Sequence, residues 1–205
     1  MAKPQQNLVF DIDLDELNAI KDMVGATEAQ VLAAYNRALS RTTQTLRKLS
    51  NSLVKDELAP KTMKKLRSRL KFFRVKSPSK LKKLDEVKLW FGLDDVPISY
   101  LKGKQKRVGS KSKPRGAVFT PKGKIDAETF EQGFLASPHG HKSIFTRTTK
   151  KRYPIKEVQV SISDRFQIAV EDEIFDKLPE IFLKHFESDL KGRLKMGMNQ
   201  KNWRQ

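Results

Sequence analysis

One long helical segment constrains this chain more than any other feature. Apolar or small residues recur every three or four positions, which places them on one side of a helix. They are Val31, Tyr35, Ala38, Leu39, Leu46, Leu49 and Leu53. Thr27 and Gln30 fit a capping box at the start. Pro60 ends the helix because proline lacks an amide hydrogen and clashes with the preceding turn. We therefore predict a helix over residues 27–59 with one face in a hydrophobic core.

Positive charge is concentrated in three blocks of the sequence. The formal net charge is +18, and residues 37–83 hold 16 Lys or Arg against two acids. Residues 102–124 and 147–156 are the other two blocks. Blocks of basic charge are typical of proteins that contact a phosphate backbone or an acidic partner, although charge also promotes solubility. Both kinds of partner are open at this point.

The second half of the chain changes from strand patterns to a helical pattern. Alternation of period two or turn signals predict strands at 87–91, 117–119 with 124–126, 130–135 with 143–148, and 158–162. Residues 96–101 are predicted to be extended. A final helix begins at Ser163, and Pro179 either kinks it or opens a second helix. The order predicts an α+β fold: a small, largely antiparallel sheet packed by a long N-terminal helix and a Pro-interrupted C-terminal helix, with a basic extended loop.

We divide the chain into an acidic N-terminal arm (1–26), one α+β domain (27–196) and a frayed C-terminal tail (197–205). The arm is expected to pack on a basic patch of its own or a neighbouring subunit. Within the domain, residues 61–76 fit either a second short helix or a strand. Residues 102–115 are predicted to form a flexible basic loop, because they lack apolar periodicity. There is no Cys, no apolar signal core and no apolar run near the roughly 18 residues of a membrane span.

Residues for catalysis or metal binding are sparse. His139 and His141 lie close together, but the Gly between them indicates a turn, and no Cys or third His is near. His185 falls in the amphipathic final helix, where we expect a packing residue. Asp94 and Asp95 fit a turn better than a Mg²⁺ site of a nuclease. We expect no enzymatic activity, no metal and no cofactor.

Nucleic-acid binding is a stronger candidate than catalysis, and it is the alternative to a contact with an acidic protein. Aromatic residues are sparse among the basic runs, so such binding would use phosphate contacts without sequence preference. The candidate residues for contact with a polyanion or an acidic partner are Lys102, Lys104, Lys106, Arg107, Lys111, Lys113, Arg115, Arg67, Arg69, Lys71 and Arg74.

A series of short motifs, in order along residues 30–196, resembles a known family. The series is Ala38-Leu39-Ser40-Arg41-Thr42 with Thr45 and Arg47, Leu66-Arg67-Ser68-Arg69-Leu70-Lys71, Ile98-Ser99-Tyr100, Gly116-Ala117-Val118-Phe119, Gly133-Phe134, Gly140-His141, Phe145-Thr146-Arg147 and Lys150-Lys151-Arg152-Tyr153-Pro154-Ile155. It resembles the minor tail protein Z family of long-tailed bacteriophages and prophages. The sharpest element comprises Lys150, Arg152, Tyr153, Pro154 and Ile155, which we interpret as a structural motif before a short strand. The acidic arm and Ser40, where Asn is common, depart from the family pattern.

The resemblance implies a structural virion protein without enzymatic activity. It would act late in tail assembly at the head-proximal neck end of the tail, in tail completion and in head–tail joining or DNA passage. It would form a homo-oligomeric ring, a hexamer rather than a dodecamer, in contact with the tail terminator, tube or connector. The resemblance also implies that the protein is in the host cytoplasm during assembly and has no membrane partner. For the basic loop, it allows a nonspecific contact with packaged DNA. The alternative is a standalone, sequence-nonspecific nucleic-acid-binding protein.

Overall fold

A computed structural model describes residues 8–9, 14–75, 86–92, 94–110, 112–138 and 140–197. These residues form two compact units. The helical unit contains the described residues of 6–50, 70–91 and 171–197, and the β-rich unit contains those of 51–69 and 92–170. Helices combined with small antiparallel sheets confirm the α+β class. That residues 27–196 form one domain stays a prediction.

The helical unit consists of helices and one three-stranded antiparallel sheet of order β1-β3-β2. Its helices are α1 (Leu14–Val24), the part of α2 (Glu28–Leu58) up to residue 50, the π-helical turn η4 (Glu171–Phe175) and α4 (Leu178–Lys195). Its strands are β1 (Leu8–Val9), β2 (Leu70–Val75) and β3 (Glu86–Phe91). The strand predicted around residues 87–91 is confirmed, and residues 70–75 form the strand rather than the helix of the two alternatives.

Helix α2 begins and ends where its sequence predicts. The Gln30 N–H donates to Thr27 Oγ1 at 3.3 Å, and the Thr27 N–H donates to Gln30 Oε1 at 2.9 Å, which confirms the capping box. The predicted apolar stripe is buried except for two half-buried members, Val31 and Leu49. The helix ends at Leu58, two residues before Pro60. Prediction from capping and periodicity therefore succeeds for this element.

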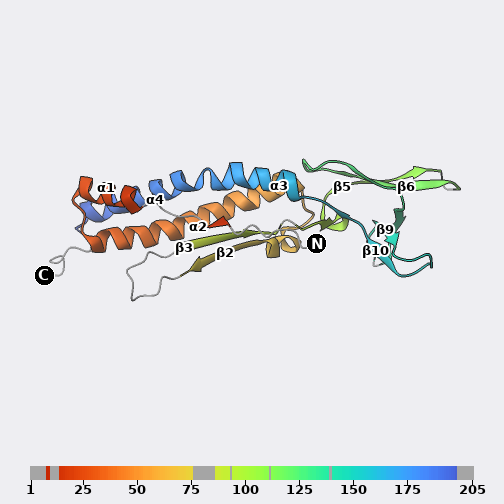
Figure 1. The fold of residues 1–205 in the computed structure, drawn as a ribbon, viewed down its shortest axis with the longest axis horizontal. Coiled ribbons are helices and arrows are strands. Elements are labelled where there is room, and N and C mark those ends of the chain that lie inside the picture. The colour runs from red at the N-terminus through yellow and green to blue at the C-terminus, as the bar shows by residue number, and fades with distance from the viewer. Residues whose placement is uncertain are drawn as a thin grey trace. The chain divides into compact units, whose positions relative to one another are not determined.

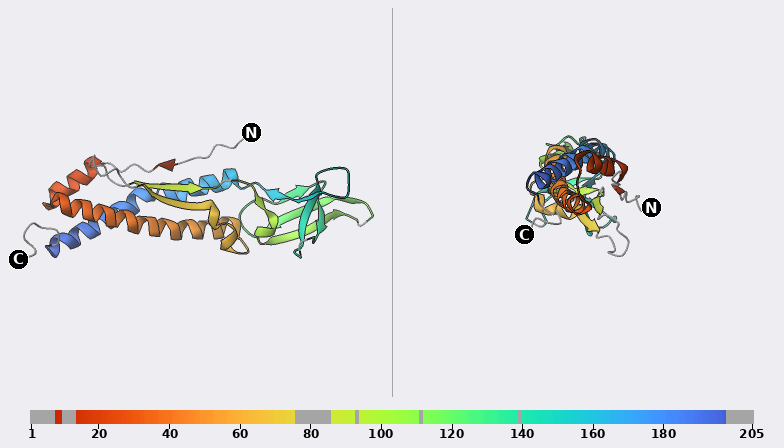
Figure 2. Two further views of the ribbon diagram at one scale, coloured as in Figure 1. Left: turned by 90° about the horizontal axis from the view of Figure 1, so that it is seen from below. Right: turned by 90° about the vertical axis from the view of Figure 1, so that its left-hand side faces the viewer.

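Helix α4 begins with Pro179 in its first turn, so this proline opens a second helix. Its row of Leu178, Phe182, Phe186 and Leu190 is buried, and the rings of Phe182 and Phe186 stack at 6.1 Å. Tyr35 of α2 meets Phe182 edge-on at 5.4 Å. Within the helical unit α2 and α4 run side by side, with β2 and β3 along them (Figures 1 and 2). This apolar layer is the core of the unit.

The β-rich unit holds three small antiparallel sheets, of orders β5-β6-β7, β10-β9-β8 and β11-β4. Its strands are β4 (Val96–Pro97), β5 (Gly103–Gly109), β6 (Pro114–Pro121), β7 (Glu128–Phe130), β8 (Phe134–Ala136), β9 (Ser143–Arg147), β10 (Ile155–Glu157) and β11 (Gln159–Val160). Its other helical elements are η1 (Met63–Lys65), η2 (Arg67–Arg69), η3 (Ile98–Tyr100) and α3 (Ser163–Val170). The predicted pairing of 130–135 with 143–148 is confirmed as β8 with β9, although Phe130 belongs to β7.

One other strand prediction for this unit is wrong, and two predicted extended segments are shorter in the structure than in the prediction. Residues 124–126 are no strand, because the Lys124 N–H donates to the Glu57 carbonyl of α2 at 2.8 Å. Strand β6 pairs with β7 on one side and with β5 on the other. The chain over 96–101 turns into η3 after two residues, because the N–H and hydroxyl of Ser99 both bond the Glu157 carboxylate. The strand predicted at 158–162 is reduced to β11, which pairs with β4.

The prediction of a basic loop at 102–115 is also wrong. Most of this segment belongs to β5 and the start of β6, which pair with each other in an antiparallel hairpin. The residues that hold β5 in a sheet lie in its partner strand, not in β5 itself. Ala117 and Phe119 of β6 are fully buried and anchor the hairpin. Gly103 permits close approach, since a Cβ there would lie 2.6 Å from the Phe119 ring. The segment is therefore regular although its own side chains are polar.

Candidate interaction surface

The sheet β5-β6-β7 presents a basic strand at one edge. In its register Lys104 lies opposite Thr120, and Lys106 lies opposite Val118. Together with Lys102 and Arg107, these side chains form what we call the basic edge, and all four are exposed. Lys113 and Arg115 at the far end of the hairpin are exposed as well. The hairpin thus contains most of the candidate cations of residues 102–115. Lys111 lies outside the described residues.

The cations of the hairpin are not neutralised within the described part of the chain. No ion pair forms there at any of six cations: Lys102, Lys104, Lys106, Arg107, Lys113 and Arg115. Like charges this close repel each other and gain from an external anion. The hairpin therefore offers a surface for a negatively charged partner.

The other candidate cations belong to other elements than the hairpin. Arg69 donates through its two terminal nitrogens to the carbonyls of Asp94 and Asp95, the second at 2.9 Å, which gives it a structural contact. Arg67 is exposed in η2. In the helical unit, the Lys71 ammonium lies 5.1 Å from the centre of the Trp90 ring. Arg74 is in β2, and its side chain lies outside the described residues.

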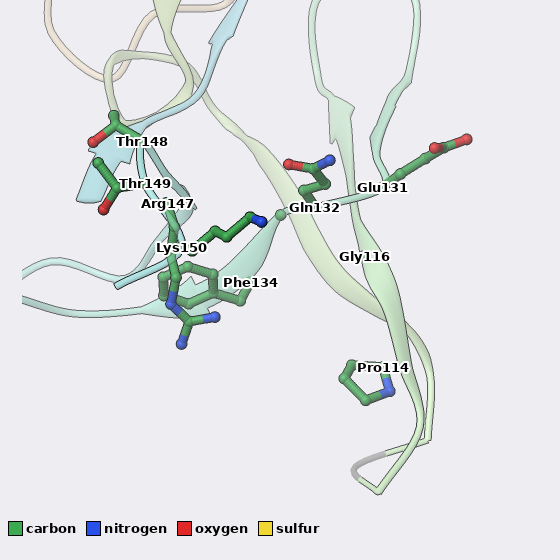
Figure 3. Close-up of a pocket in the computed structure, with 10 residues that line it drawn as sticks. Pro114, Gly116, Glu131, Gln132, Phe134, Arg147, Thr148, Thr149 and Lys150 are labelled. Atoms are coloured by element: carbon green, nitrogen blue, oxygen red, sulfur yellow. The ribbon is translucent and has the colours of Figure 1, made fainter. Parts of the chain in front are cut away.

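Beside the hairpin lies an open groove of about 690 Å³, lined by residues from β6, the β7–β8 turn, β8, β9 and the segment after β9. Figure 3 shows the Lys150 side chain pointing toward Gln132, whereas Glu131 points away. The Arg147 guanidinium lies 5.0 Å from the centre of the Phe134 ring. The groove therefore combines two cationic side chains with one aromatic ring.

The segment from Lys150 to Ile155 returns to the strand that precedes it. The N–H and the hydroxyl of Thr148 both donate to the Pro154 carbonyl, at 3.2 and 3.1 Å. Strand β10 begins at Ile155, directly after Pro154, as we predicted. Lys150, Arg152 and Tyr153 are exposed at this turn. The structural role of the motif stays a prediction.

Sequence reasoning missed a buried carboxylate at the end of α2. Glu57 is 5% exposed and accepts from Lys124 Nζ at 2.7 Å and from Arg165 Nε at 3.3 Å. The hydrogen bond and charge of Glu57 raise the pKa of Lys124 above its ordinary value. The partners lie 67 and 108 residues away, so no local pattern could have indicated them. This cluster ties α2 to the connection before β7 and to α3.

A second carboxylate, Glu157, joins two other segments of the β-rich unit. It accepts from the Ser99 N–H at 2.9 Å, from the Ser99 hydroxyl at 3.0 Å and from the Ser143 hydroxyl. Both serines are buried. The contact joins η3, β9 and β10 and leaves the carboxylate engaged in structure rather than chemistry.

The opposite edge of the same sheet is acidic. Asp126, Glu128 and Glu131 surround β7, are exposed, and form no ion pair within the described residues. We call them the acidic edge; residues 125–141 contain no Lys or Arg. Burial and the nearby charge of Asp95 raise the pKa of Glu128 above its ordinary value. The three carboxylates of the acidic edge thus have no ion-pair partner among the described residues.

Within the described residues, no group of three or more His, Asp or Glu is placed to hold a metal ion. His139 lies outside them, and His141 is exposed. His185 is half-buried in α4, as expected for a packing residue, and its Nε2 lies 3.3 Å from Thr45 Oγ1. In the same part of the chain, no helix has the length and apolar character needed to span a membrane.

Fold and surface together define a small α+β protein whose exposed sheet edges carry opposite charges. The profile of the prophage minor tail protein Z (GPZ) family matches residues 13–200. The chain therefore belongs to this family and is a prophage minor tail protein, associated with the virion tail. No curated protein and no solved structure matched the chain.

Proposed function

We propose that this protein completes the phage tail at its head-proximal neck end, where it acts in head–tail joining or DNA passage. Family membership supports a structural role in the tail without catalysis. The observation that carries the proposal is the set of exposed cations on the β5–β6 hairpin that form no ion pair with the residues the structure describes, which suits a subunit held between negatively charged neighbours.

The proposed assembly is a homo-oligomeric ring, with a hexamer favoured over a dodecamer. The ring would contact the tail terminator, the tube or the connector, after assembly in the host cytoplasm. Closed rings arise when one patch of a subunit meets a different patch of the next. A subunit with distinct charged edges supports such a contact.

The direct test is the location of the protein in the virion. Cryo-electron microscopy of phage particles should show its density at the neck end of the tail, and a mutant phage lacking it should build tails that do not yield infectious particles. Density at the tail tip, or normal infectivity without the protein, would contradict the proposal.

A standalone, sequence-nonspecific nucleic-acid-binding protein is the second candidate, favoured by the same exposed cations. Each phosphate neutralised adds about −0.9 to the slope of log affinity against log salt. Changing Lys102, Lys104, Lys106, Arg107, Lys113 and Arg115 to Gln should flatten that slope by several units if duplex DNA is the partner. An unchanged slope would exclude DNA as the partner of the hairpin.

A further inference from the structure

The two edges of the sheet β5-β6-β7 are complementary in charge. The basic edge has four cations on or beside β5, and the acidic edge has three carboxylates on or beside β7. Neither set is paired within the described residues. Because β6 lies between them, neither edge can neutralise the other within one sheet. A second copy of the chain brings the missing counter-charges.

The acidic edge is also hollowed. A groove of about 270 Å³ lies between the segment before β7 and the segment before α3. Its lining combines the apolar residues Ile125, Val160 and Ile162 with the acids Asp126, Glu128 and Asp164, and its one cation, Arg165, is paired with Glu57. Long cationic side chains bury their methylene stems against apolar surface and keep the charged head near polar groups. The groove therefore matches a Lys or Arg side chain.

Strands β5 and β7 are the end strands of their sheet, and neither has a second strand partner among the described residues. The Lys122 N–H donates to the Lys102 carbonyl at 2.8 Å, which sets the alternation of the antiparallel ladder. The peptide groups of Lys104 and Lys106 then face β6, and those of Gln105 and Arg107 face outward. By the same alternation the peptide groups of Thr129 face outward from β7. Such edges accept strands from other chains, and exposed Lys restricts which strands can pair.

We propose that the basic edge of one subunit docks on the acidic edge and groove of a second copy. Lys104 and Lys106, which share one face of β5, then lie against Asp126 and Glu128, so the contact joins two different surfaces and continues from copy to copy. This inference rests on the homo-oligomeric ring proposed above and names its interface. A second copy is favoured over DNA because DNA would leave the carboxylates of the acidic edge unpaired.

The test uses two variants of the full chain with opposite charge reversals. Lys104→Glu/Lys106→Glu lowers the net charge of the basic edge from +4 to 0, and Asp126→Lys/Glu128→Lys changes that of the acidic edge from −3 to +1. Sedimentation velocity measures self-association at about 0.05 M and about 0.5 M salt, where screening differs strongly. The unmodified chain should associate at low salt and less at high salt. Each variant alone should associate roughly tenfold or more weakly, because the attraction between the two edges is then lost and the substituted side chains meet like charges. A mixture of the two should regain association, since each variant carries the edge that the other lacks.

Lys142→Glu/Lys151→Glu is the matched control for Lys104→Glu/Lys106→Glu, because it makes the same change in net charge at exposed residues that belong to neither edge. It should associate as the unmodified chain does, and circular dichroism should show all variants folded. The inference is overturned if the unmodified chain does not self-associate at low salt, if single variants associate normally, or if the mixture does not recover. Neck density in the virion tests the proposed function separately, because it does not depend on which surfaces join the subunits.

Discussion

Helix α4 and strand β5 distribute their side chains in opposite ways. In α4 the row Leu178, Phe182, Phe186 and Leu190 is at most 2% exposed. In β5 no side chain is buried, and the strand is held by β6, whose Phe119 is fully buried. The difference separates two roles: α4 stabilises its unit by apolar burial, whereas β5 is stabilised by its neighbour and keeps its own side chains available for contact. Substitutions in the two elements should therefore change different measurements.

The largest effect on stability is expected from Phe186→Ala. Phe186 is fully buried and stacks on Phe182, so its loss leaves a cavity in the core of the helical unit. The free energy of unfolding should fall by about 3–5 kcal/mol, measured by urea denaturation. Met196→Ala, at an exposed apolar residue just after the helix, is the control and should change stability by less than about 0.5 kcal/mol. Equal changes in the free energy of unfolding for the two variants would contradict the assignment of Phe186 and α4 to the core.

A smaller effect is expected where charge rather than apolar area is buried. Glu57→Gln keeps the shape of the side chain but removes the charge that Lys124 and Arg165 share. Losing charge-assisted hydrogen bonds should lower the free energy of unfolding by about 1–3 kcal/mol. Asp56→Gln, at the exposed neighbouring residue, provides the control. If Glu57→Gln left stability unchanged, the cluster would add nothing to holding α2 and α3 together.

The same contrast explains how far the sequence could predict the fold. Helices α2 and α4 follow from residues within one turn of each other, such as Thr27 with Gln30 or Phe182 with Phe186, so periodicity and capping suffice. Strand β5 depends on Phe119 in another strand, and its own Gly, Lys and Gln residues resemble a loop. Glu57 and Glu157 have partners far away in sequence, so their roles follow only from the fold. The basic side chains of the hairpin were predicted from charge alone, whereas the acidic edge was missed because three spaced acids form no run.

A pH effect confined to the helical unit is expected from His185. Burial, together with the charges of Arg41 and Lys184, lowers the pKa of His185 below its ordinary 6.5. Above pH 6.5 the ring is neutral in both states, and stability is full. As the pH falls below that value, the unfolded chain takes up the proton first, so the free energy of unfolding decreases. His185→Gln should reduce this decrease between about pH 7 and about pH 5 in urea denaturation. If His185→Gln left the pH dependence of stability unchanged, the effect would belong to another group.

The smallest effect on stability is expected from Lys104→Gln/Lys106→Gln. Both side chains are exposed and form no ion pair within the described residues, and the β5–β6 ladder uses their backbone, which the substitution preserves. The free energy of unfolding should therefore change by less than about 0.5 kcal/mol. It should not fall, because removing two like charges from one strand relieves repulsion. Urea denaturation checks this value, and Gly103→Ala provides the contrast in the same strand. A Cβ at residue 103 would lie 2.6 Å from both the Phe119 ring and the Thr120 carbonyl, so that variant should destabilise the hairpin while leaving every cation in place. If the lysine variant lost as much stability as the glycine variant, the basic side chains would hold the strand in place, and the separation between the element that stabilises and the element that contacts would fail.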